Sequence, residues 1–442
     1  MSVSLSIRQD AIRRRGEAVC HYCLIYLMIA CADSFLYDLF LMNAAIPIVG
    51  LFLMIILLNR KYQLVYPLSI LALALISMLF VRANTGAMGP TELISWVMMV
   101  VVTVVTVLYD INHFLVRFIK IASFLATFSL VMYLLSQVVP GIWQVLTPFS
   151  FTLTLGDETY FDTYVKIVDY YKASGLILYV DRGFEADRNV SIFREPAVFQ
   201  IMLNSIIFLL LFMCPKEIKA KSRKLLIGLL LVSILSTKSA TGYATTLLIF
   251  FAYAVNSKQN DDNISLLIPI ALGVACVAMF VFSSVGNTGL AANSVLGRFF
   301  DGGNIRLDGS GQARVGAANV AISLMQQHPF GCGYDVYGAE LLNGDGLVGA
   351  CLFKVAAVYG SLFGVAIIVW VCYPVFKSRE LGLAAKVTFL LMYLIATYLE
   401  NEVFYTTIIF IPIYLYCNKV VGAADSPSSA DALSSGVLHE VN

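Results

Sequence analysis

Charged residues are scarce in this chain: they make up 13% of its 442 residues, whereas 59% are hydrophobic. Soluble domains carry about 25% charged residues, so the composition excludes an ordinary soluble domain. It indicates instead an all-α, polytopic integral membrane protein. The net charge of +1 gives no sign of a nucleic-acid partner, and the informative feature is where the charges lie along the chain.

Ligands for a metal ion are also scarce. The chain has four histidines, and its long polar loops contain no Asp-x-Asp pair. Cys20-His21-Tyr22-Cys23 resembles a metal site in isolation, but it lies in the first apolar segment without further ligands. The nine cysteines lie mostly inside apolar runs, where they suit packing better than a disulfide framework. We therefore expect neither a metal nor a cofactor.

Apolar runs long enough to cross a membrane recur along the chain, since a helix needs about 20 residues to span the hydrocarbon layer. We expect that the first is not a cleaved signal peptide, because no small-residue cleavage site follows it and the next run begins almost at once. We count twelve, near 18–33, 40–58, 62–81, 93–109, 119–139, 196–214, 222–237, 239–255, 264–284, 349–373, 382–399 and 403–418.

These runs divide the chain into six parts. We predict N-terminal transmembrane helices (1–139), a first large outer loop (140–195), central transmembrane helices (196–284), a second large outer loop (285–348), C-terminal transmembrane helices (349–420) and a disordered cytoplasmic tail (421–442).

Basic residues recur at every second boundary, and such ends are cytoplasmic. Both termini are therefore predicted to lie inside and both long loops outside. Two predictions are possible for the segment 225–255: one long helix, or two short helices around Thr237-Lys238-Ser239. Two helices preserve the charge rule and are preferred. The basic boundaries are Arg8 to Arg15, Arg60-Lys61, Arg117 and Lys120, Lys216 to Lys224, Lys258, Lys377 to Lys386, and Lys419.

The first long loop is rich in aromatic residues, and part of it has helical periodicity. Phe161, Tyr164, Val165, Val168 and Tyr171 recur at the spacing of one helix face. We expect an amphipathic helix there, lying at the membrane interface.

Charges at the edges of the apolar runs are the best indication of a site, because each needs a partner or a water-filled cavity. None lies in the middle of a predicted span, so the spans offer few groups that could carry an ion or a proton across the membrane. By the predicted topology all of them lie toward the outer face: Arg194, Glu195, Lys238, Lys354, Glu400 and Glu402.

Arg194-Glu195-Pro196 opens the sixth run. Pro196 fits the first position of a helix, and Glu195 before it favours the positive end of the helix dipole. Arg194 could then bind an anion, most naturally a phosphate, through its bidentate guanidinium. The alternative is an interfacial cap with a snorkelling arginine.

The second long loop carries three more candidate anion ligands, Arg298, Arg306 and Arg314, spaced eight residues apart. As solvated charges they need no explanation, but facing Arg194 they would suit a pyrophosphate. His328 follows a short helix expected over Val320 to Met325 and is a candidate general base. It could equally be a histidine at the end of a helix.

Asp335 and Asp345 are alternatives to His328 as base, because their Gly-rich loops could close over a ligand.

Three short motifs, taken in order, resemble the bacterial Wzy-type polysaccharide polymerases, a family that includes O-antigen and colanic-acid polymerases and is related to O-antigen ligases. They are Arg188-Asn189-Val190-Ser191-Ile192-Phe193-Arg194-Glu195-Pro196-Ala197-Val198-Phe199, then Thr237-Lys238-Ser239-Ala240-Thr241-Gly242, then Gln327-His328-Pro329-Phe330-Gly331-Cys332-Gly333 with Gly360-Ser361-Leu362-Phe363-Gly364.

The resemblance implies a metal-independent glycosyltransferase at the periplasmic face of the bacterial inner membrane. It would transfer a growing glycan from undecaprenyl diphosphate to a new lipid-linked repeat unit. Arg194, Lys238 and the loop arginines would bind the diphosphate. Glu195 would cap the helix, hold Arg194 or take part in the chemistry, and we favour its holding Arg194. Tyr164 and Tyr171 would stack on the glycan, and His328 or Asp335 would act as base. A chain-length regulator and a flippase are candidate partners.

Two other functions stay open. Ligase-like relatives often carry a His-Asn pair where this chain has Gly349-Ala350, which disfavours a ligase. A lipid-oligosaccharide flippase would suit twelve spans, but the internal repeats common in transporters are not visible.

Overall fold

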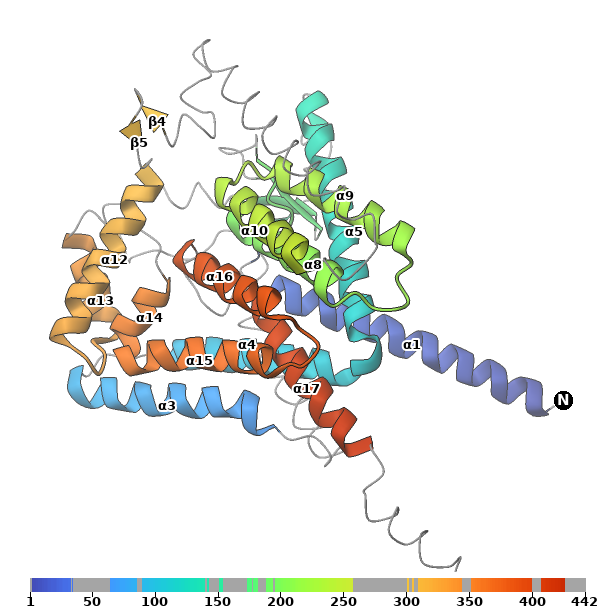
Figure 1. The fold of residues 1–442 in the computed structure, drawn as a ribbon, viewed down its shortest axis with the longest axis horizontal. Coiled ribbons are helices and arrows are strands. Elements are labelled where there is room, and N and C mark those ends of the chain that lie inside the picture. Colours follow the sequence, from blue (N-terminus) through green and yellow to red (C-terminus); the bar gives the residue numbers. More distant parts are fainter. Residues whose placement is uncertain are drawn as a thin grey trace, which may run out of the picture.

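The computed structural model is mostly helical, as the sequence predicts (Figure 1). It describes residues 2–32, 34, 64–85, 90–139, 141–142, 151–153, 173–176, 178–181, 188–193, 195–256, 300–301, 304–305, 309–343, 351–399 and 407–425. The predicted runs 40–58 and 264–284, the amphipathic segment 161–171 and residues 426–442 of the predicted tail (421–442) lie outside these residues. Residues 421–425, which were predicted to be disordered, belong instead to the last helix.

Most of the predicted spans that fall within the described residues correspond to single helices. In chain order the helices are α1 (Ser2–Ala30), α3 (Val65–Thr85), α4 (Pro90–Tyr109), α5 (Ile111–Val138), α8 (Pro196–Phe212), α9 (Ala220–Ser236), α10 (Ala240–Asn256), α12 (Gly309–Gln327), α13 (Gly333–Asn343), α14 (Cys351–Tyr359), α15 (Ser361–Lys377), α16 (Leu383–Leu399), the short 3₁₀ helix η8 (Thr407–Ile409) and α17 (Phe410–Asp425).

Short strands, which were not predicted from the sequence, lie in the two segments that were predicted to be long loops. β1 (Phe151–Leu153), β2 (Ala173–Leu176) and β3 (Tyr179–Asp181) form an antiparallel sheet in that order, and β4 (Phe300–Asp301) pairs with β5 (Asn304–Ile305). The N–H of Val180 in β3 donates to the carbonyl of Ser191 at 2.8 Å. The first sheet is therefore joined to the segment that leads into α8.

The described helices around α8 show how the chain reverses. Along α8 and α10, Gln200 meets Gly242, Asn204 bonds Thr246 and the ring of Phe212 meets that of Tyr253. The contacts advance together on both helices, so α8 and α10 run parallel and side by side.

Helix α9 runs the opposite way, because its last residue, Ser236, meets Asn189 just before α8 begins. Helix α9 ends and α10 starts around Thr237–Ser239, where Lys238 has a left-handed φ of 48°. The prediction of two helices over 225–255 is confirmed.

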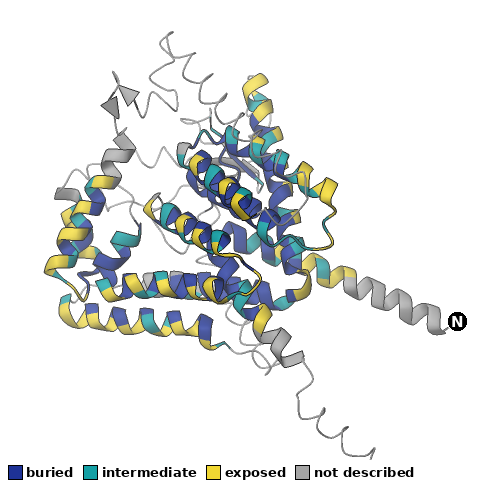
Figure 2. Ribbon diagram, viewed as in Figure 1, coloured by how far each residue is buried: buried dark blue, intermediate teal, exposed yellow. Residues whose placement is uncertain are grey.

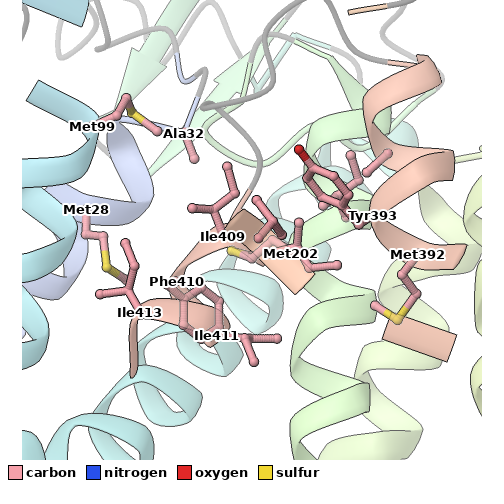
Figure 3. Packing of buried hydrophobic residues seen from close by; sticks show 14 of the residues in the cluster. Met28, Ala32, Met99, Met202, Met392, Tyr393, Ile409, Phe410, Ile411 and Ile413 are labelled. Atoms are coloured by element: carbon pink, nitrogen blue, oxygen red, sulfur yellow. The ribbon is translucent and has the colours of Figure 1, made fainter. Parts of the chain in front are cut away.

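Helix α8 is the core of the described chain, buried from Pro196 to Leu211 (Figure 2). An apolar helix that is buried all round must be surrounded by other helices. Figure 3 shows part of the packing, in which Met28 of α1, Met202 of α8, Tyr393 of α16 and Phe410 of α17 belong to one hydrophobic cluster.

Helices at the edge of the bundle keep an apolar face exposed. On α15 the exposed apolar residues recur every three or four positions, the spacing of one helix face. Among the described helices, α3 and α5 are long and apolar enough to cross a membrane. The exposed residues of α15 are Leu362, Val365, Val369, Tyr373 and Phe376.

The tenth predicted span, 349–373, is broken in two at Gly360. Its φ of 106° separates α14 from α15. The turn after α12 packs into this break: the N–H of Cys332 donates to the carbonyl of Ala357 at 2.9 Å, and the N–H of Ser361 donates to that of Pro329 at 3.0 Å. The two glycine-bearing pieces of the third motif therefore lie against each other.

A polar network ties α1 to the α4–α5 turn. The His21 ring is buried; its Nε2–H donates to the carbonyl of Thr106 at 2.9 Å, and its Nδ1 accepts from Arg117 at 2.7 Å. Arg117 also pairs with Asp110 at 2.7 Å. Burial alone would raise the pKa of Asp110, but the hydrogen bond from His113 and the nearby positive charges hold it below its ordinary value. Both ring nitrogens of His21 are thus bonded to residues of α4 and α5.

Replacing Gly331 by alanine tests the close packing of the glycine turn. A Cβ there would lie 2.5 Å from the carbonyl oxygen of Val358, and the φ of 104° disfavours any side chain. We expect Gly331→Ala to cost at least about 2 kcal/mol of stability. The control Gly338→Ala, in α13 with nothing within 4 Å, should gain about 0.5–1 kcal/mol. Thermal unfolding of the two purified variants in detergent makes the comparison, and equal unfolding temperatures would contradict it.

Candidate functional site

The first two motifs of the resemblance lie against each other. The backbone N–H of Asn189 donates to the carbonyl of Ser236 at 3.0 Å, and the Nε–H of Arg188 donates to the carbonyl of Thr237 at 3.1 Å. Residues 188–193 are thereby held on the end of α9. We call residues 188–193, Glu195, the start of α8 and the turn at 237–239 the outer junction, after the side of the membrane on which the sequence predicts them to lie.

Asn189 links three parts of the chain at the outer junction. Its fully buried side chain donates from Nδ2 to the hydroxyl of Ser236 at 3.0 Å and to that of Ser129, on α5, at 3.4 Å. Its Oδ1 accepts the backbone N–H of Ser191 at 3.1 Å. All the polar atoms of this amide face partners, as the burial of a polar group requires.

The outer junction also holds unusual backbone conformations. Among the described residues, Ser191 and Lys238 are the non-glycine residues with positive φ, at 56° and 48°. Each costs about 1–2 kcal/mol, and such residues persist where surrounding contacts fix them, often at functional sites. The buried hydroxyl of Ser191 has no hydrogen-bond partner in the described structure.

Two helices begin side by side at the junction, but only one is capped by its own side chain. The hydroxyl of Ser239 accepts the N–H of Gly242 at 3.3 Å, which caps α10. Glu195 occupies the cap position of α8, yet its side chain makes no capping hydrogen bond. The first N–H groups of α8, which carry the positive end of its dipole, are therefore not satisfied by Glu195.

Two of the predicted site residues, Glu195 and Lys238, thus lie at the same end of two adjacent helices. Both are partly exposed. Arg314 lies in the first half of α12. The remaining predicted ligands lie outside the described residues: Arg194, Arg298, Arg306, Tyr164 and Tyr171.

The proposed base residues lie on another part of the bundle. Helices α12 and α13 (orange in Figure 1) stand apart from α8, α9 and α10. His328 follows α12, where its N–H donates to the carbonyl of Leu324 and its carbonyl accepts the N–H of Gly331. Asp335 is exposed in the first turn of α13. The described residues do not bring His328 or Asp335 to Glu195, so their role as base stays a prediction.

No site role was predicted from the sequence for Arg188, Asn189 or Ser191. Arg188 and Asn189 open the first motif, and this position was their only signal. Their partners Ser129, Ser236 and Thr237 lie 47 to 60 residues away in the chain, a distance at which local patterns carry no information.

Comparison of the chain with protein-family models, with curated proteins and with solved structures finds no match.

Paired substitutions test the difference between the two helix starts. Removing the Ser239 hydroxyl in Ser239→Ala should cost about 1 kcal/mol, because α10 loses its cap. Glu195→Ala should change stability by less than about 0.5 kcal/mol, because Glu195 caps nothing. Thermal unfolding of both purified variants checks this, and a larger loss from Glu195→Ala would show that Glu195 stabilises α8 after all.

Proposed function

We propose that the chain polymerises undecaprenyl-diphosphate-linked oligosaccharide repeat units at the periplasmic face of the bacterial inner membrane. The observation that carries this proposal is the outer junction. There Arg188 donates to the carbonyl of Thr237, next to Lys238, at the turn that leads into α10. Helix α10 packs beside the first turns of α8, whose first N–H groups Glu195 does not cap. Positive side chains beside a helix N-terminus favour an anionic ligand such as a diphosphate.

The exposed apolar faces of the helices at the edge of the bundle support a membrane location. Apolar side chains exposed along a helix face suit contact with lipid and are costly in water. The charge-based topology agrees with two long-range contacts. Ser34 pairs with Phe193, both predicted to be outer, and Gly382 meets Asn256, both predicted to be inner.

The proposed reaction joins the reducing end of the donor glycan to a hydroxyl of the acceptor repeat. The acceptor oxygen forms a bond to the anomeric carbon, and the bond from that carbon to the diphosphate oxygen breaks. Undecaprenyl diphosphate leaves with the electron pair, and the hydroxyl proton passes to His328 or Asp335. Arg194, Lys238 and the loop arginines would stabilise the charge that develops on the leaving group.

Glu195 would hold Arg194 in place for that task. Tyr164 and Tyr171 would stack on the sugar rings of the glycan. Because both substrates are confined to the membrane, holding them in register would supply much of the acceleration.

Deletion of the gene in its native host, with lipid-linked glycans separated by size, tests the function. If the chain is a polymerase, its loss should leave single repeat units on the lipid carrier or its final acceptor. Long chains retained on the carrier would indicate a ligase. Single repeats retained on the cytoplasmic side would indicate a flippase and overturn the proposal.

The first motif is tested by Arg194→Lys. A lysine keeps the charge but loses the planar fork that binds phosphate with two hydrogen bonds, so we expect at least a tenfold loss of polymerised glycan at normal expression. Arg82→Lys, on the exposed surface of α3, is the control and should retain activity. A wild-type distribution of chain lengths in Arg194→Lys would refute the phosphate role.

A further inference from the structure

The segment before α8 is built to hold one conformation. Ser191 sits in the left-handed region with φ of 56°, where a side chain is disfavoured. The Oδ1 of Asn189 accepts the N–H of Ser191 two residues on, a local turn that favours this bend. The strained residue is thus fixed by the neighbouring amide.

The same amide fixes where the turn sits in the bundle. Nδ2 of Asn189 bonds hydroxyls on α5 and at the end of α9, and its backbone N–H bonds the carbonyl of Ser236. Arg188, the residue before Asn189, donates from Nε to the carbonyl of Thr237. Loss of the Asn189 amide would therefore release Arg188 and the approach to α8 together.

We propose that Asn189 is a positioning residue for the diphosphate site. It does not touch the substrate, being fully buried; it sets the place of Arg188 and of the chain entering α8. The proposal rests on the proposed function for the nature of the ligand, but the placement it describes can be measured without any activity.

Asn204 provides a matched control. It is also a fully buried asparagine, with its Nδ2 bonded to Gln200 at 2.9 Å and to the carbonyl of Gly242 at 3.2 Å, and its Oδ1 bonded by Thr246 at 2.7 Å. Its partners are α8 itself and α10, and none belongs to residues 188–193. Asn189→Ala and Asn204→Ala remove the same atoms from equally buried places.

The test uses the full-length protein in lipid nanodiscs, with hydrogen exchange followed by mass spectrometry. Exchange in residues 188–193 should be at least tenfold faster in Asn189→Ala than in the wild type, and unchanged in Asn204→Ala. Asn189→Asp keeps the acceptor for Ser191 but loses both Nδ2 donors, so it should restore only part of the protection. Equal exchange of this segment in the two alanine variants would overturn the proposal.

Binding of undecaprenyl diphosphate to the same samples gives the second readout. The Kd should rise at least tenfold in Asn189→Ala and stay within twofold in Asn204→Ala. Faster exchange with an unchanged Kd would overturn the positioning role. Failure of the wild-type chain to bind undecaprenyl diphosphate would instead overturn the proposed function, so the wild type and the variants report separately on the two claims.

Discussion

The reversal at Thr237–Ser239 is the constraint on which the outer junction depends. Because α9 ends there and α10 begins at once, α8 and α10 run parallel and start at the same end of the bundle. Lys238 makes the turn in the left-handed region, and Ser239 caps α10. One long helix over the same residues would carry the start of α10 away from α8.

Parallel neighbouring helices place two dipoles with the same sign at one end, which is unfavourable unless that end meets negative charge or water. The N-termini of α8 and α10 differ in how they are capped. Helix α10 is closed by Ser239, whereas α8 follows an Arg-Glu pair and opens without a side-chain cap from Glu195. This asymmetry gives the outer junction its proposed preference for an anion.

The other half of the described bundle is organised by close approach of backbone. Gly331 and Gly360 each leave no room for a Cβ against the other segment, so the turn after α12 fits into the break between α14 and α15. This contact fixes His328 at the end of α12. It also explains why the third motif combines two glycine-rich pieces separated in the sequence.

The length of the apolar runs predicted most of the described helices, and the basic residues between them favoured two helices with a turn at 237–239 over one long helix. The break at Gly360 was missed, because the run 349–373 is apolar throughout and a left-handed glycine leaves no mark on hydrophobicity. The short strands were missed because they lie in polar loops of mixed composition. At the junction, Glu195 and Lys238 followed from charge at the edges of spans. Asn189 did not, because its role exists only through partners far along the chain.

Sided labelling tests the central claim most directly, since a periplasmic outer junction requires the turn at 237–239 to face the periplasm and the α15–α16 turn to face the cytoplasm. Lys238→Cys and Arg379→Cys would be made singly in a chain whose native cysteines are replaced. A membrane-impermeant maleimide applied to intact spheroplasts should label Lys238→Cys, and should label Arg379→Cys only after the membrane is permeabilised. Labelling of both positions from the same side, or of Arg379→Cys alone in intact spheroplasts, would contradict the account.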